Sequence, residues 1–267
     1  MEILGYIASV LIGVSLGMVG SGGSILTVPV LVYLMHINPL LATTSSLFIV
    51  GATSLAGGLR AYSKKLVDFK AVTEFGIPSI FSIFITRHYL LPALPDQLFS
   101  IGKIAVSKDM FLMVIFAVLM LAAAITMIRN HNGENIKPTK NNDSRNKALP
   151  LVLLGLIIGV ITGLLGAGGG FLIIPTLVLF LRLNMKMAVG TSLLIIAINS
   201  LFGFLFSLKQ FEYNWTVLIS FTIFGIAGIF IGSKIAEKIS STSLKKGFGW
   251  FVLIMGIYII IKELFLP

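Results

Sequence analysis

The chain has 267 residues, of which 57 % are hydrophobic and only 11 % are charged, and its mean hydropathy is +1.02. Soluble domains carry about 25 % charged residues, so this composition excludes an ordinary water-soluble globular protein. The net charge of +10 does not indicate nucleic-acid binding, because the basic residues lie mainly between apolar segments, where they orient membrane helices. With no cysteine and three scattered histidines, we expect no disulfide, no metal site and no cofactor.

Apolar segments separated by short polar stretches predict an all-α polytopic membrane protein with eight to ten apolar helical segments. They cover residues 2–19, 24–36, 40–59, 71–92, 109–128, 148–165, 170–182, 187–208, 214–235 and 247–265. A helix needs ~20 residues to cross about 30 Å of hydrocarbon, so 24–36 and 170–182 either cross fully or form re-entrant hairpins. The polar stretch 129–147 predicts a linker between membrane repeat 1, residues 1–128, and membrane repeat 2, residues 148–267.

The two sets of segments are repeats that are offset by 146 residues. Residues 17–59 and 163–205 share 17 identities in 43 gapless positions, including glycines, a proline and an asparagine. If the linker is cytoplasmic, all but five of the 20 Lys and Arg residues fall on the cytoplasmic side, as the positive-inside rule requires. Each repeat then crosses the membrane an odd number of times. The pair is therefore predicted to form inverted-topology repeats, as in many secondary transporters.

Each repeat has a glycine-rich stretch between two apolar segments, GSGGS at 20–24 and GAGGG at 166–170. Irregular backbone at membrane depth occurs only where protein or a wet cavity surrounds it, and glycine lets a ligand approach the backbone. The helix that follows begins with free N–H groups and a positive dipole end, which favour an anion. Alternatively, the glycines only permit close helix packing, as the spacing of Gly13 and Gly17, or of Gly159 and Gly163, indicates.

Further polar side chains lie in or near the third and fourth segments. The hydroxyls of ATTSS, 42–46, and AVGTS, 188–192, either bind an oxyanion or cap a membrane helix. Asn199 either faces a transport pathway or bonds across helices, and Arg87 is either an anion-attracting gate or a side chain that snorkels to the headgroups. The predicted binding residues are Gly20, Ser21, Gly22, Gly23, Ser24, Thr44, Ser45, Ser46, Gly166, Gly168, Gly169, Gly170, Thr191, Ser192 and Asn199, with Arg87 as the gate.

The duplicated motif Gly-x-x-Gly-x-Gly-Gly with a following proline, together with the TSS and GTS clusters, resembles the sulfite/anion exporter family, TauE/SafE. FITRHYLLPALPD at 84–96 also resembles a stretch of one subgroup of that family. The resemblance covers nearly the whole chain. It implies an integral membrane transporter of small sulfur-containing anions such as sulfite, thiosulfate or organosulfonates, generally assigned to export. The functional positions that it implies are Gly20–Ser24, Gly166–Gly170, Thr44–Ser46 and Thr191–Ser192.

We therefore expect a multi-pass transporter of the cell (inner) membrane that carries a small anionic solute by alternating access between inverted halves. H⁺ or Na⁺ is the candidate coupling ion, and Glu74 is the one acidic residue placed to move a proton, although its position at a segment edge favours a surface role. An anion channel, or an importer of the same anions, would use the same residues. An intramembrane enzyme is excluded because the chain has no HExxH, no GxSxG and no pair of mid-membrane aspartates.

Overall fold

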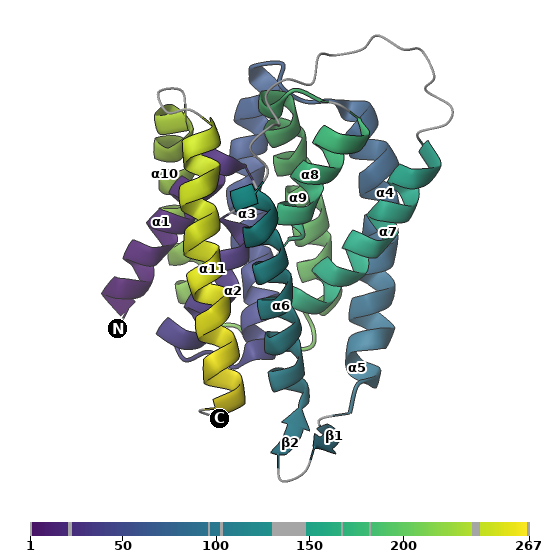
Figure 1. Ribbon diagram of the computed structural model, residues 1–267, viewed down its shortest axis with the longest axis vertical. Helices are drawn as coiled ribbons and strands as arrows, with labels where there is room; N and C mark the ends of the chain where they lie inside the picture. Colours follow the sequence, from purple (N-terminus) through teal and green to yellow (C-terminus); the bar gives the residue numbers. More distant parts are fainter. Residues whose placement is uncertain are drawn as a thin grey trace.

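A computed structural model describes residues 2–20, 23–95, 97–101, 104–129, 148–166, 168–181, 183–236 and 241–265 as a bundle of helices (Figure 1). The helices are α1 (Glu2–Val19), α2 (Ser24–Pro29), α3 (Pro39–Ser63), α4 (Phe69–Ile85), α5 (Leu91–Ala93), α6 (Lys108–Arg129), α7 (Ala148–Leu165), α8 (Gly170–Phe180), α9 (Met185–Ser207), α10 (Trp215–Ala236) and α11 (Ser241–Phe265). Each predicted apolar segment is helical, which confirms the helical membrane fold. The predicted linker lies almost entirely outside the described residues.

The connection between α5 and α6 contains a β-hairpin that the apolar pattern did not predict. Strands β1 (Gln97–Ile101) and β2 (Ile104–Ser107) pair antiparallel at the bottom of Figure 1. Helix α4 runs down toward this hairpin and α6 runs back up from it. We refer to this side as the hairpin end, and to the side where α6 ends and α7 begins as the linker end.

Two π-helical turns, η1 (Val30–Leu34) and η2 (Thr86–Leu90), continue α2 and α4. A proline lies near each turn. Pro29 directly precedes η1, and Pro92 lies two residues after η2. Proline has no N–H to donate and its ring crowds the carbonyl four residues earlier, so the wider turn of η2 accommodates Pro92. The hydrogen bond from the Leu91 amide to the Thr86 carbonyl follows this wider pattern.

The bundle exposes large apolar side chains and buries many polar ones among its apolar core. Large apolar side chains such as Ile77, Phe81 and Ile223 are exposed on its outer surface. Buried side chains include many serines and threonines of α3 and α9. Among the described residues, five helical stretches are long and apolar enough to cross a membrane: Pro39–Ser63, Phe69–Ala93, Lys108–Ile125, Met185–Ser207 and Trp215–Ala236.

The extensive contacts between long helices all join the part of the chain before the linker to the part after it. Helix α1 packs on α10, α4 on α7 and α9, α3 on α9 and α10, and α6 on α11. Within the described residues, consecutive long helices such as α3 and α4 make no comparable contact. The two parts are therefore interlocked.

Glycines allow the closest of these approaches. A Cβ at Gly13 would collide with the backbone of Gly225, and one at Gly17 would collide with the Ile229 carbonyl, so α1 and α10 touch backbone to backbone. In the α4–α7 pair, a Cβ at Gly159 would lie 2.5 Å from the Ser79 carbonyl oxygen. The packing interpretation of these flanking glycines is confirmed.

Candidate functional site

The two glycine-rich turns hold backbone conformations that favour glycine. Gly20 has φ +81° in the first turn, and Gly166, Gly168 and Gly169 have φ between +64° and +68° in the second. A side chain in this region costs roughly 1–2 kcal/mol, so these glycines are needed for the turn itself. Gly23 has an ordinary helical φ of −66°. The predicted site residues Ser21 and Gly22 lie outside the described residues.

The helix after each turn is short. Ser24–Leu34 (α2 with η1) and Gly170–Phe180 (α8) have 11 residues each. At about 1.5 Å per residue each spans about 16 Å, roughly half of the hydrocarbon core, so neither crosses alone. Helix α2 contacts α8, and neither helix has a side-chain N-cap. Their first N–H groups are thus left to other partners.

The second turn reaches the middle of the α3–α9 pair. A Cβ at Gly168 would lie 2.9 Å from Ser200 Oγ, 3.0 Å from Ile196 Cγ2 and 3.2 Å from Val50 Cγ1, all central positions of the two helices. The hydroxyls of Ser200 on α9 and of Ser54 on α3 are buried and without a partner in the described residues. Backbone amides and free hydroxyls therefore converge where the α8 N-terminus meets these helices.

Asparagines, not the predicted hydroxyls, cap the third helix of each set. Asn38 Oδ1 accepts from the Leu40 amide at 3.0 Å, and Asn184 Oδ1 accepts from the Met187 amide at 2.9 Å. The capping interpretation of the Thr–Ser clusters was therefore wrong, because both helices begin about one turn before them. Thr44, Ser45, Ser46, Thr191 and Ser192 are instead buried inside the bundle.

These hydroxyl clusters do not form one site. Helices α3 and α9 run in opposite directions, so Thr44–Ser46 lies toward the hairpin end and Thr191–Ser192 toward the linker end. Ser46 has no hydrogen-bond partner in the described residues, whereas Ser192 Oγ donates to the Val189 carbonyl at 2.8 Å. Thr191 Oγ1 accepts from the Asp68 amide at 2.9 Å, which ties α9 to the α3–α4 connection.

Asn199 bonds across helices, as one of its two interpretations predicted. Its Oδ1 accepts from Ser79 Oγ on α4 at 2.9 Å, and the side chain is fully buried. Its Nδ2 has no partner in the described part of the chain. The amide is thus half-satisfied, which is costly in an apolar surrounding.

Arg87 does not snorkel, because it is 0 % exposed. It lies on η2 near the hairpin end, and its Nη1 donates to Thr44 Oγ1 at 2.9 Å. Nε and Nη2 have no partner among the described residues. The structure thus brings together two predicted site residues from different elements, Arg87 and Thr44.

The connection between α9 and α10 lies beside Arg87. Gln210 Nε2 donates to the Arg87 carbonyl at 3.4 Å, and Tyr213 Oη donates to the Ser207 carbonyl at 3.0 Å. Burial raises the pKa of Tyr213 to about 12, while the positive charge of Arg87 opposes the rise. Tyr213 is therefore a neutral phenol at physiological pH. Sequence reasoning missed both residues, since nothing local to residues 208–214 signals their proximity to Arg87.

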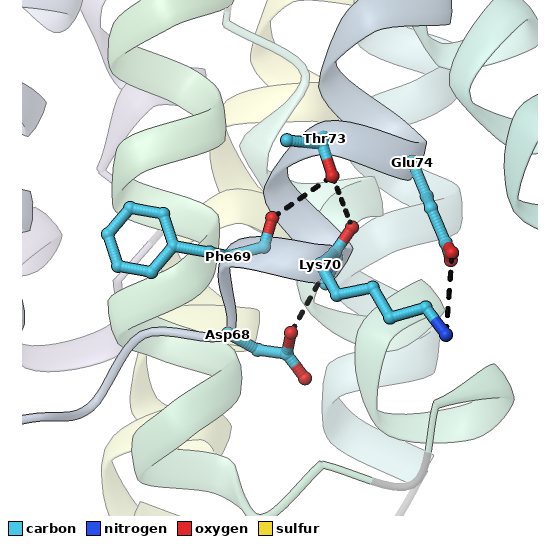
Figure 2. A network of polar contacts seen from close by, with 6 residues as sticks. Asp68, Phe69, Lys70, Thr73 and Glu74 are labelled. Atoms are coloured by element: carbon cyan, nitrogen blue, oxygen red, sulfur yellow. Dashed lines mark hydrogen bonds and ion pairs between the residues drawn. The ribbon is translucent and has the colours of Figure 1, made fainter. Parts of the chain in front are cut away.

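Glu74 lies at the surface of the linker end. It faces Lys70 at 3.7 Å, one helical turn earlier on α4, and the Lys70 side chain is 61 % exposed (Figure 2). Asp68 begins the helix by accepting from the Ala71 amide at 3.1 Å. Both carboxylates thus stabilise the start of α4.

Sequence reasoning also missed Ser54 and Ser200, although a signal was present. They are identical residues 146 positions apart, within the 17–59 and 163–205 match. Thr27 on α2 and Thr162 on α7 are likewise buried, with hydroxyls that lack a partner in the described residues. Neither threonine belongs to a sequence pattern that predicts a site.

An apolar exterior, several membrane-long helices and many buried polar side chains define a multi-pass membrane protein. The family model described as "Sulfite exporter TauE/SafE" matches residues 5–259. The chain belongs to the TauE/SafE sulfite exporter family, whose members are membrane transporters and not enzymes.

Relatives with similar length share this class. The chain is 29 % identical over 259 residues to a "Probable membrane transporter protein" of Xylella fastidiosa, covering 94 % of this chain and 91 % of the relative. It is 27 % identical over 275 residues to the "Probable membrane transporter protein YunE" of Bacillus subtilis, covering 97 % and 96 %. A relative from Methanocaldococcus jannaschii, "Probable membrane transporter protein MJ0441", is 27 % identical over 274 residues, covering 94 % of each chain. No solved structure gives a significant match.

Proposed function

We propose that the protein is a secondary transporter that exports a small oxyanion, such as sulfite, thiosulfate or an organosulfonate, across the cell membrane. The charge of the buried polar side chains is the observation that carries the proposal. Buried polar residues in the described part of the chain are serines, threonines, Asn199, Arg87 and Lys108, and none is an Asp or Glu, although the atom Oδ1 of Asp109 at the start of α6 is buried. Such an interior offers mainly donors and positive charge, which suit an anion better than a cation. The family description supports sulfite as the substrate class.

The anion is held at the centre of the bundle, where the glycine turns meet α3 and α9. Support comes from the free hydroxyl of Ser200 beside Gly168, and from the uncapped N-terminus of α8 at Gly170. Backbone N–H groups and a helix dipole favour an oxyanion there without the cost of a buried cation. The first turn, Gly20–Ser24, takes the corresponding role beside α3.

The two parts of the chain form inverted repeats. In support, α1, α2 with η1, and α4 with η2 start and end 146 residues before α7, α8 and α10. Tertiary contacts follow the same offset. Corresponding contacts are Gly20 with Val189 and Gly166 with Thr43, Gly23 with Ile12 and Gly169 with Ile158, and Gly57 with Ile229 and Gly203 with Ile83.

The linker end is the cytoplasmic end. Basic residues are more numerous there: Arg60, Lys64, Lys65, Lys70, Arg129, Lys186, Lys234, Lys245 and Lys246. Arg87, Lys108, Lys209 and Lys262 lie toward the hairpin end. This bias follows the positive-inside rule.

Alternating access in this bundle moves helix pairs and not whole halves. Because α1 packs on α10 and α4 packs on α7, each closely packed pair contains one helix from each half. A half cannot rock as a rigid body without separating backbone contacts such as Gly13 on Gly225. The α1–α10 and α4–α7 pairs therefore shift against the α3–α9 pair, alternately uncovering the two ends.

The test is sulfite exchange in proteoliposomes that contain the purified full chain. Preloaded unlabelled sulfite should accelerate entry of radiolabelled sulfite, and the rate should saturate. Imposed pH and Na⁺ gradients then identify the coupling ion. Inhibition of only those transporters whose linker end faces the outside of the vesicle gives the direction of transport.

Three results would contradict the proposal. A flux that rises linearly with sulfite and shows no exchange stimulation indicates a channel. Concentrative uptake toward the linker end indicates an importer. Transport of cations in place of oxyanions would contradict the argument from the buried polar interior.

A further inference from the structure

Arg87 is a buried cation with unused hydrogen-bonding capacity. Its guanidinium is fully buried, and only Nη1 has a partner among the described residues, Thr44 Oγ1 at 2.9 Å. A buried charge that lacks a counter-charge is strongly unfavourable, so a partner of opposite charge would stabilise it. Among the described residues, no carboxylate makes an ion pair with Arg87, and the neighbouring Tyr213 is a neutral phenol.

The two unused donors lie on one edge of the guanidinium. Nη1 is the nitrogen cis to Cδ, so the Nε–H and one Nη2–H point out side by side on the opposite edge. That edge matches two oxygens of a single oxyanion, as in side-on Arg–carboxylate and Arg–phosphate pairs. A halide ion offers one atom and cannot use both donors equally well. The two donors thus select an oxyanion over a halide by shape as well as by charge.

Two elements adjoin Arg87 from different sides. Thr44 on α3 fixes Nη1 from one side, and Gln210 on the α9–α10 connection bonds the Arg87 backbone from another. The Gln210 contact is long, at 3.4 Å, and the Gln210 residue is exposed. Residues 208–214 therefore adjoin Arg87 at the hairpin end of the bundle, where the Gln210 bond and the packing of Tyr213 on Phe204 hold them.

We propose that Arg87, supported by Thr44, directly binds an oxyanion that presents two adjacent oxygens, a sulfonate, sulfite or carboxylate, and that residues 208–214 close over it. This inference rests on the proposed function and narrows its substrate class. It makes Arg87 a ligand-binding residue, where the gate hypothesis required only electrostatic attraction. The Arg87 site lies at the hairpin end of the transport pathway and is separate from the proposed anion site at the glycine-rich turns.

Tryptophan fluorescence provides a binding assay on the full chain in lipid nanodiscs. The ring of Trp215 lies tilted against the ring of Tyr213, with centroids 5.9 Å apart, and so adjoins residues 208–214. Trp250, the other tryptophan, is 56 % exposed on α11, and Trp250→Phe removes its signal. Potassium methanesulfonate, which resists oxidation, replaces potassium chloride at constant total salt.

We expect a saturable fluorescence change with methanesulfonate that chloride does not produce. Arg87→Lys keeps the charge but loses the two-donor edge, so affinity should fall at least tenfold and the preference over chloride should shrink. Arg60→Lys is the matched control, because Arg60 already bonds Ser233 Oγ at 2.6 Å and should keep affinity within twofold. The change in preference separates ligand binding from a structural role, and Arg87→Gln provides a second variant if Arg87→Lys misfolds.

Asp96 lies outside the described residues and is tested by substitution. If Arg87 binds the anion, Asp96→Asn leaves methanesulfonate affinity unchanged. If Asp96 were the internal counter-charge of Arg87, the unmodified chain would give no methanesulfonate response and Asp96→Asn would create one, which overturns the proposal.

Other outcomes also decide the question. Equal responses to chloride and methanesulfonate, or unchanged affinity in Arg87→Lys, overturn the inference. Sulfite exchange with no methanesulfonate response overturns the inference and leaves the transport proposal standing. A response lost in Arg87→Lys, with no exchange of any oxyanion by the unmodified chain, supports the binding site and contradicts the transport proposal.

Discussion

Turn η2 and the last turn of α10 are 146 residues apart and correspond in the two halves of the chain, yet their polar side chains are bonded differently. Arg87 on η2 keeps two donors without a partner in the described residues. Ser233, its counterpart on α10, donates to the Phe230 carbonyl at 3.0 Å and accepts from Arg60 Nη1 at 2.6 Å. Ser233 is thus satisfied within the protein, whereas Arg87 keeps bonding capacity open.

This difference shows that the two repeats share their packing contacts but not their polar side-chain bonds. Glycine contacts such as Gly57 with Ile229 and Gly203 with Ile83 recur because helix approach is set by backbone geometry. Ligand-binding side chains are not constrained by backbone geometry in this way, and one copy of a binding site is enough. We therefore expect substitutions in the shared packing to impair both ends, and substitutions at Arg87 to affect one end.

The largest effect is expected at the second glycine turn. Gly168→Val places a β-branched residue at φ +68°, with its Cβ 2.9 Å from Ser200 Oγ. Strain and overpacking together cost about 2–5 kcal/mol, and sulfite exchange should fall to background. Gly22→Val, its counterpart in the first half, should do the same. Membrane insertion and gel-filtration profile serve as controls, and full exchange activity in both variants would refute a role for the turns.

Removing Arg87 should stabilise the anion-free protein. Arg87→Met replaces an uncompensated buried charge with an apolar side chain, which typically gains on the order of 1–4 kcal/mol. Arg60→Met should instead lower the melting temperature, because it removes bonds to Ser233 and stacking on Phe230 at 5.6 Å. Thermal unfolding in nanodiscs compares the two. A lower melting temperature for Arg87→Met would indicate an internal partner for the arginine.

The interhelical bond of Asn199 gives a smaller effect. Ser79→Ala leaves both polar atoms of this buried amide without a side-chain partner and should cost about 1–3 kcal/mol. Thr53 corresponds to Asn199 in the first half, and its buried hydroxyl has no partner in the described residues. Thr53→Val should therefore be neutral or stabilising. Equal losses in unfolding free energy would contradict this asymmetry.

A gain of under 1 kcal/mol is expected at Gly76. This buried helical glycine has no described atom within 4 Å of where its Cβ would lie, so Gly76→Ala should stabilise by about 0.5–1 kcal/mol. Gly163→Ala on α7 is the control. Its Cβ would lie 2.8 Å from Thr86 Cβ, so the melting temperature should fall.

The smallest effect concerns pH. The folded pKa of Tyr213, about 12, exceeds its usual value of 10.0, so its contribution to stability is complete below pH 10 and is lost as pH rises toward 12. Between pH 6 and 9, Tyr213→Phe should leave the pH dependence of the melting temperature unchanged. Above pH 10 the variant should lose less stability than the unmodified chain. A difference in slope near neutral pH would contradict the assignment of Tyr213 as a neutral phenol.

The helices could be predicted from sequence because the bilayer imposes length and apolarity on each segment. The residues 2–19 and 148–165 were predicted with the observed boundaries of α1 and α7. The β-hairpin was not predicted, because residues 97–107 lie outside the membrane-spanning segments, where apolar periodicity carries no constraint. Helix pairing across the linker was also missed, since apolar patterns say which residues are buried and not against which helix.

The site was predictable in part. The repeat offset identified the glycine turns, and the charge pattern singled out Arg87 as an exception. The role of Thr44 as the partner of Arg87 depends on a contact between residues 43 positions apart, which no local pattern shows. The Thr–Ser clusters were misread as possible caps because the true caps, Asn38 and Asn184, lie four or more residues earlier.

The interlocked pairing of helices has a consequence for biosynthesis. Helices α1, α3, α4 and α6 have their extensive partners in the part of the chain that is translated last. At about 5–20 residues per second, the ribosome needs on the order of ten seconds to add that part. During this interval Thr44 and Arg87 lack the cover of Gln210 and Tyr213, so the nascent first half must be shielded by the insertion machinery or stay at the aqueous edge. Native assembly is therefore a late, concerted step that follows insertion of the last helices.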